Sequence, residues 1–115
     1  MSAEDNPARP GPGAFVCALD QIRPHGAIVL DFSVGDARFS MLVTRTPSGV
    51  NAFENVCPHA RSPLERPDGR VVVQHRRFIV CSAHGASFQM DTGRCVAGPG
   101  LGTALNRIAV TVERG

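Results

Sequence analysis

Two short pairs of cysteine and histidine place the strongest constraint on this chain. The first is Cys57-Pro58-His59 and the second is Cys81-Ser82-Ala83-His84, and each pair follows an apolar run that is typical of a strand. A hairpin-like segment of 21 residues, Ala60–Val80, separates them. Each pair is therefore expected in a loop at a strand end. A metal group that binds all four side chains would require the two loops to meet.

The rest of the chain predicts an all-β fold, because short apolar runs alternate with turn residues and no segment carries a sustained apolar period of 3.6. Turns are expected at Gly35-Asp36, Pro47-Ser48-Gly49 and Pro67-Asp68-Gly69. The expected strands are Phe15–Leu19, Ala27–Phe32, Phe39–Thr44, Val50–Phe53, Val71–Val73, Phe78–Val80, Ser87–Met90 and Ile108–Val112. Their lengths and spacing are typical of a β-sandwich or barrel.

The chain of 115 residues suffices for one domain. Residues 1–14 are rich in proline and glycine, and we expect a flexible N-terminal tail there and one domain over 15–115. No apolar run approaches the length of a membrane span, and the acidic N-terminus lacks the apolar stretch of a secretory signal. These features predict a cytoplasmic protein. The net charge of only +2 argues against a nucleic-acid partner.

Two kinds of metal group suit the four Cys and His side chains. A single zinc ion accepts a Cys₂His₂ set, but zinc fingers usually group their cysteines in one pair and their histidines in the other. A [2Fe–2S] cluster with two cysteines on one iron and two histidines on the other suits mixed pairs, because each loop then supplies one ligand to each iron. A chance arrangement that binds no metal is the remaining interpretation.

The two pairs, followed by Gly85, resemble the ligand signature of the Rieske iron–sulfur proteins. The stretch Asp91–Pro99 is also similar to the one that follows this signature in Rieske ferredoxins. The resemblance extends over roughly Phe15 to Arg114 and implies an antiparallel β-sandwich with a small projecting cluster-binding subdomain at about 56–100. It implies one [2Fe–2S] cluster per chain, covered by a third loop at Gly98-Pro99-Gly100.

The resemblance also implies a role for each ligand. Cys57 and Cys81 would hold the buried iron, and His59 and His84 the outer iron near solvent. No catalytic residue is implied.

Several positions depart from relatives in the family. Two extra cysteines of membrane-complex Rieske proteins, which form a disulfide, match Ser62 and Ala83 here. Two hydroxyl donors that raise the potential of those relatives match Ala86 and Phe88. Arg61 stands where a small residue, often glycine, is frequent. Without the two donors, we expect a potential in the lower part of the Rieske range of about −150 to +300 mV.

The resemblance implies a soluble, low-potential Rieske-type ferredoxin that carries one electron, rather than a stand-alone enzyme. The chain has no dinucleotide fingerprint, and His25 and His75 alone cannot form the mononuclear iron site of an oxygenase. We expect a monomer that accepts electrons from a flavin-dependent reductase and passes them to a terminal oxygenase or similar oxidoreductase. The alternatives are an accessory or redox-sensing Rieske module and a zinc-binding structural module.

The other cysteines and histidines are expected to be structural. Cys17 and Cys95 are interpreted as small buried apolar residues, His25 as a surface turn residue and His75 as the tip of a hairpin. Five arginines also lie between the pairs: Arg61, Arg66, Arg70, Arg76 and Arg77. They represent either scattered solvated charge or a basic collar around the cluster that attracts an acidic partner.

Overall fold

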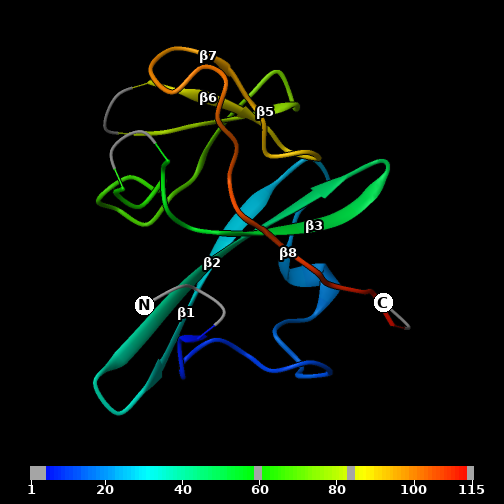
Figure 1. Ribbon diagram of the computed structural model, residues 1–115. Coiled ribbons are helices and arrows are strands. Elements are labelled where there is room, and N and C mark those ends of the chain that lie inside the picture. The colour runs from blue at the N-terminus through cyan, green and yellow to red at the C-terminus, as the bar shows by residue number, and fades with distance from the viewer. Residues whose placement is uncertain (1–4, 59–60, 83–84, 114–115) are drawn as a thin grey trace.

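The computed structural model describes residues 5–58, 61–82 and 85–113, which form two four-stranded antiparallel sheets (Figure 1). The first sheet has the order β1-β2-β3-β8, with β1 at Ala27–Val34, β2 at Ala37–Thr46, β3 at Gly49–Glu54 and β8 at Arg107–Ile108. The second has the order β4-β5-β6-β7, with β4 at Val72–Gln74, β5 at Phe78–Val80, β6 at Ser87–Gln89 and β7 at Cys95–Ala97. The predicted all-β class is confirmed. No helix in these ranges is long and apolar enough to cross a membrane.

Strands β1 to β6 lie where the apolar runs predict them, and three details differ. The predicted strand Phe15–Leu19 is wrong, because Val16 and Cys17 lie outside both sheets and pack against the face of the first. The strand predicted at Ile108–Val112 pairs with β3 only at Arg107–Ile108, although Val110 still contacts the same core. Strand β7 was not predicted.

Both faces of the first sheet are covered, because successive side chains of a strand point to opposite faces. On one face, Leu42 and Phe53 are fully buried in a core shared with the second sheet. On the other face, Met41, Val43 and Ala52 belong to a separate core. Figure 1 shows the second sheet stacked over the strands of the first.

The N-terminal segment covers this other face of the first sheet. Ala8 and Ile22 are both buried there, at 4% and 1% exposure. The Asn6 side chain accepts the Ala8 N–H at 2.9 Å and donates to the Arg38 carbonyl of β2 at 2.7 Å. Ala8 therefore packs into a core although it lies within the expected tail of residues 1–14. The boundary between that tail and a domain over 15–115 stays a prediction.

A buried hydrogen bond and a closely packed glycine also connect the two sheets. Thr44 of β2 is fully buried, and its hydroxyl donates to the Met90 carbonyl just after β6 at 2.6 Å. Gly93, in the turn before β7, has a φ of +77°, and a Cβ there would lie 2.7 Å from the Phe53 ring. These contacts hold the second sheet, with its adjoining loops, in one orientation on the first.

Candidate metal centre

The two predicted ligand loops, residues 57–62 and 81–86, close with the same backbone hydrogen bonds. In each loop the cysteine N–H donates to the carbonyl of the residue five positions later. The cysteine carbonyl accepts the N–H of the residue four positions later. The bonds are Cys57 N–H to Ser62 O (2.8 Å), Arg61 N–H to Cys57 O (2.6 Å), Cys81 N–H to Ala86 O (2.8 Å) and Gly85 N–H to Cys81 O (2.9 Å). The described ends of the two loops are therefore equivalent, with the cysteines at matching positions.

The fourth residue after each cysteine has a left-handed backbone. The φ of Arg61 is 57° and that of Gly85 is 75°. A Cβ at Gly85 would meet nothing within 4 Å, so the backbone conformation rather than space favours glycine there. The same backbone geometry favours glycine at the position of Arg61. A non-glycine residue in this region costs about 1–2 kcal/mol.

Both cysteines are buried, whereas the loops around them reach the surface. Cys57 and Cys81 are 0% and 1% exposed and belong to the core between the sheets, together with Phe88. By contrast, Arg61 and Gly85 are exposed. Each loop thus runs from a buried thiol to solvent within four residues.

A buried asparagine ties the first loop to the chain that follows it. Asn55 is 2% exposed, and its side-chain oxygen accepts the Leu64 N–H at 3.0 Å. Its amide nitrogen donates to Ser40 Oγ at 3.0 Å and to Glu65 Oε1 at 2.8 Å. Sequence analysis did not identify Asn55, because a single asparagine after a strand carries no distinctive pattern.

The second loop contacts this same segment. The Ser82 N–H donates to the Leu64 carbonyl at 3.3 Å, and the Ser82 hydroxyl donates to the Glu65 carbonyl at 2.9 Å. Leu64 and Glu65 therefore bridge the two ligand loops. The bridge ties the loop of Cys57 to the loop of Cys81.

His59 and His84 lie outside the described residues, so two of the four predicted ligands are placed and two are not. Within 5–58, 61–82 and 85–113, no group of three or more Cys, His, Asp and Glu side chains could hold a metal ion. The described donors do fit a [2Fe–2S] group. They are two buried sulfurs at equivalent positions of two joined loops, as a cluster clamped between loop tips requires.

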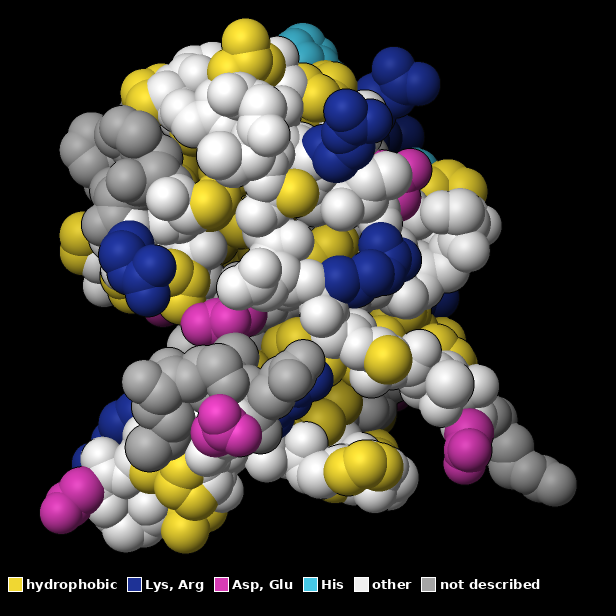
Figure 2. Space-filling view, viewed as in Figure 1, with side chains coloured by type: hydrophobic (Ala, Val, Ile, Leu, Met, Phe, Trp, Pro, Cys, Tyr) yellow, Lys and Arg dark blue, Asp and Glu magenta, His cyan; other side chains and the backbone are white. Residues whose placement is uncertain are grey.

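The arginines between the pairs do not form one continuous collar. Arg61 lies in the first ligand loop, and Arg66 lines a hollow beside Cys81 while pairing with Asp68 at 3.5 Å. Arg76 and Arg77 lie at the β4–β5 hairpin, at the opposite end of β5 from Cys81. Figure 2 likewise shows the arginine side chains of one face in separate patches. Arg70 lies beside Arg66, whose N–H donates to the Arg70 carbonyl at 2.8 Å. A collar around the cluster can therefore include Arg61, Arg66 and Arg70, but not Arg76 and Arg77.

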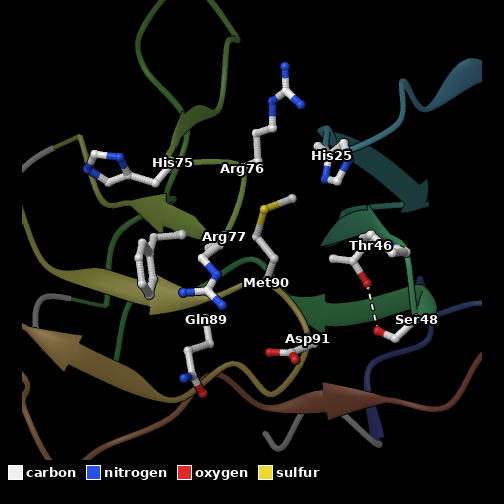
Figure 3. A pocket seen from close by; sticks show the side chains of 11 residues that line it. His25, Thr46, Ser48, His75, Arg76, Arg77, Gln89, Met90 and Asp91 are labelled. Atoms are coloured by element: carbon white, nitrogen blue, oxygen red, sulfur yellow. Dashed lines mark hydrogen bonds between the residues drawn. The ribbon is translucent and has the colours of Figure 1, made fainter.

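His25 and His75 occupy turns, as predicted, and line a second hollow between the two sheets (Figure 3). His75 is exposed at the β4–β5 hairpin, and His25 precedes β1. The Nδ1 atom of His25 is buried and has no hydrogen-bond partner among the described residues. In Figure 3 the two side chains come from turns beside different sheets and do not converge on one point.

The remaining cysteines, Cys17 and Cys95, pack in different cores. Cys95 is 6% exposed in the core between the sheets, and its thiol lies 3.4 Å from the Ala97 carbonyl. Cys17 is half-buried against the other core, and this burial raises the pKa of its thiol. All four cysteines lie in described parts of the chain, and no disulfide joins them. Burial of Cys95 is confirmed, whereas that of Cys17 is incomplete.

Comparisons with known proteins agree with this geometry. The family model described as Rieske [2Fe-2S] domain matches residues 14–110. Among solved structures, the chain is similar to the ferredoxin of carbazole 1,9a-dioxygenase from Nocardioides aromaticivorans IC177. The identity is 26% and the TM-score 0.65, over 88% of this chain and 89% of that one. A search of curated proteins finds no match. The chain therefore belongs to the Rieske [2Fe-2S] domain family, whose cofactor is a [2Fe–2S] cluster.

Proposed function

We propose that this protein carries single electrons from a flavin-dependent reductase to a terminal oxygenase or a similar oxidoreductase. The observation that supports this role most directly is the similarity to the ferredoxin of a dioxygenase, which extends over most of both chains. The match to the Rieske [2Fe-2S] domain model covers residues 14–110. When bound, the cluster supplies reversible one-electron oxidation and reduction.

We propose Cys57, His59, Cys81 and His84 as the four cluster ligands. The equivalent, buried positions of the two cysteines support the inner half of this assignment, because an iron bound there would be shielded from solvent. The exposed residues Arg61 and Gly85, which follow the two histidines, support an outer, solvent-facing half. Partner proteins would then approach the cluster from the histidine side.

The loop bridge supports a carrier, since it ties the two proposed ligand loops to one segment of the chain. Asn55 accepts the Leu64 N–H and donates to the Glu65 side chain, while Ser82 donates to the carbonyls of both residues. A site that changes little between redox states can exchange electrons with two partners in turn. We further propose that the protein acts as a monomer in the cytoplasm.

The ligand assignment is tested on purified protein expressed with ample iron. We expect two irons and two acid-labile sulfides per chain, and a rhombic EPR signal after reduction with dithionite. Zinc in stoichiometric amount, without visible absorption, would contradict the assignment and favour a structural zinc module.

The carrier role is tested by anaerobic mixing. With NADH supplied at one electron equivalent per cluster, catalytic amounts of a flavin-dependent ferredoxin reductase should reduce the cluster fully. An excess of oxidised, substrate-loaded oxygenase should then reoxidise it. The absorbance of the cluster follows both steps. A cluster that dithionite reduces, but that neither protein reduces or reoxidises, would favour the accessory or sensing role instead.

A further inference from the structure

The Ser62 hydroxyl is a buried polar group without a described hydrogen-bond partner. Its Oγ atom is inaccessible to solvent, and no acceptor or donor among residues 5–58, 61–82 and 85–113 contacts it. Buried hydroxyls are nearly always hydrogen-bonded, so an orphan of this kind points to a group that binds there. Ser62 lies in the loop that begins with Cys57, and its own carbonyl accepts the Cys57 N–H.

Two polar side chains near the loops, those of Asn55 and Ser82, donate hydrogen bonds to other groups. The side-chain amide of Asn55 donates to Ser40 and Glu65. The Ser82 hydroxyl donates to the Glu65 carbonyl. The partner that Ser62 lacks is therefore not supplied by these neighbours.

The matching ends of the two loops show which residue of the second loop corresponds to Ser62. Ser62 closes the first loop through its carbonyl as Ala86 closes the second, five residues after the cysteine in each case. The resemblance to higher-potential Rieske proteins implies a hydroxyl donor at the position of Ala86. In this chain the hydroxyl stands at the matching position of the other loop.

We propose that the Ser62 hydroxyl donates a hydrogen bond to a sulfur of the [2Fe–2S] cluster and thereby raises its reduction potential. The inference rests on the proposed ligand set, since Cys57 must hold the cluster beside Ser62. One-electron reduction adds a negative charge to the cluster, and a donor stabilises the reduced state more than the oxidised state. Ser62 thus acts as a tuning residue and is not itself a ligand.

The test is the reduction potential of Ser62→Ala, measured by voltammetry on protein with an intact cluster. We expect the equilibrium constant for reduction to fall about three- to tenfold, since net hydrogen-bond contributions are of that order. A tenfold fall corresponds to 59 mV for one electron. Ser62→Thr, which keeps the hydroxyl, should retain the potential of the original protein. The control Ser33→Ala changes an exposed serine of β1 and should leave the potential unchanged.

A second measurement separates tuning from a structural role. Because the hydroxyl has no described protein partner, Ser62→Ala should not lower the thermal stability of the cluster-free protein. An unchanged potential with an intact EPR signal would overturn the proposal. So would loss of the cluster in both Ser62→Ala and Ser62→Gly, because Ser62 would then be structural. Failure of the original protein to bind any cluster would instead contradict the proposed function.

Discussion

The side-chain oxygen of Asn55 accepts the backbone N–H of Leu64 at 3.0 Å, and this bond spans the whole first ligand loop. Both residues are buried, so no solvent replaces either partner. The bond brings the end of β3 and the segment after the loop together. The geometry of Cys57 therefore depends on a residue that is not a ligand.

Asn55→Ala should destabilise the protein and loosen its cluster. The substitution leaves the Leu64 N–H buried without an acceptor, which costs about 1–3 kcal/mol, and also removes two donors. Urea unfolding should show a loss of about 2–3 kcal/mol, and a chelator should bleach the cluster faster. Asn106→Ala is the matched control, because its exposed amide bonds only the Glu54 side chain, at 3.2 Å. Equal stability losses in the two variants would contradict this role of Asn55.

Arg61→Gly should stabilise the first loop. Glycine adopts the φ of 57° without strain, although its greater freedom in the unfolded chain offsets part of the gain. The expected net effect is an increase of about 0.5–1 kcal/mol in the free energy of unfolding. Arg61→Ala removes the same charge but keeps Cβ, so it should show no gain. If both variants behave alike, the charge and not the backbone governs stability at this position.

The sequence predicts most of the fold because burial leaves a local pattern. Strands β1 to β6 carry apolar runs bounded by turn residues, and those runs are visible without the structure. The error at Phe15–Leu19 has a physical cause. A segment that crosses a sheet face buries apolar residues as a strand does, so composition alone does not distinguish the two. Strand β7 is only three residues long, and two of them are exposed.

The candidate site also has features that the sequence predicts and features that it could not predict. The motif names Cys57 and Cys81, and the structure places both in the core. The bridge through Leu64 and Glu65 could not be predicted, because it joins residues that meet only after both sheets form. The equivalence of Ser62 and Ala86 likewise depends on backbone hydrogen bonds, which sequence spacing does not reveal. The ligand roles of His59 and His84 stay predictions.

The four cysteines should fall into two classes when each is replaced. Cys57→Ala and Cys81→Ala remove proposed anionic ligands and should abolish cluster assembly. Cys17→Ser and Cys95→Ser should keep the visible and EPR spectra, since Cys17 packs against the other core and the Cys95 thiol faces the Ala97 carbonyl. Iron analysis and absorption spectra check both classes. Loss of colour in either serine variant would show that the structural cysteines are misassigned.

Hydroxyl donors added to the second loop should raise the reduction potential. Ala86→Ser and Phe88→Tyr place O–H groups at the two positions where higher-potential relatives have them, and both residues are fully buried beside Cys81 in the core. A hydrogen bond to a charged acceptor contributes about 1.5–3 kcal/mol, but only the difference between the redox states changes the potential. A difference of about 1 kcal/mol corresponds to roughly +40 mV for one electron. Voltammetry of the double variant should show this rise.

The combination with Ser62→Ala makes the test of these donors sharper. Ser62→Ala with Ala86→Ser moves one hydroxyl from the first loop to the equivalent position of the second. Because the loops close with the same hydrogen bonds, the potential should return towards that of the original protein. The space beside residue 86 is limited on the side of Gly98. Gly98 approaches it so closely that a Cβ at Gly98 would lie 3.1 Å from the Ala86 Cα. An intact cluster whose potential falls in the Ala86→Ser variant would mean that position 86 does not face a sulfur, and the two loops would then differ around the cluster despite their matching backbones.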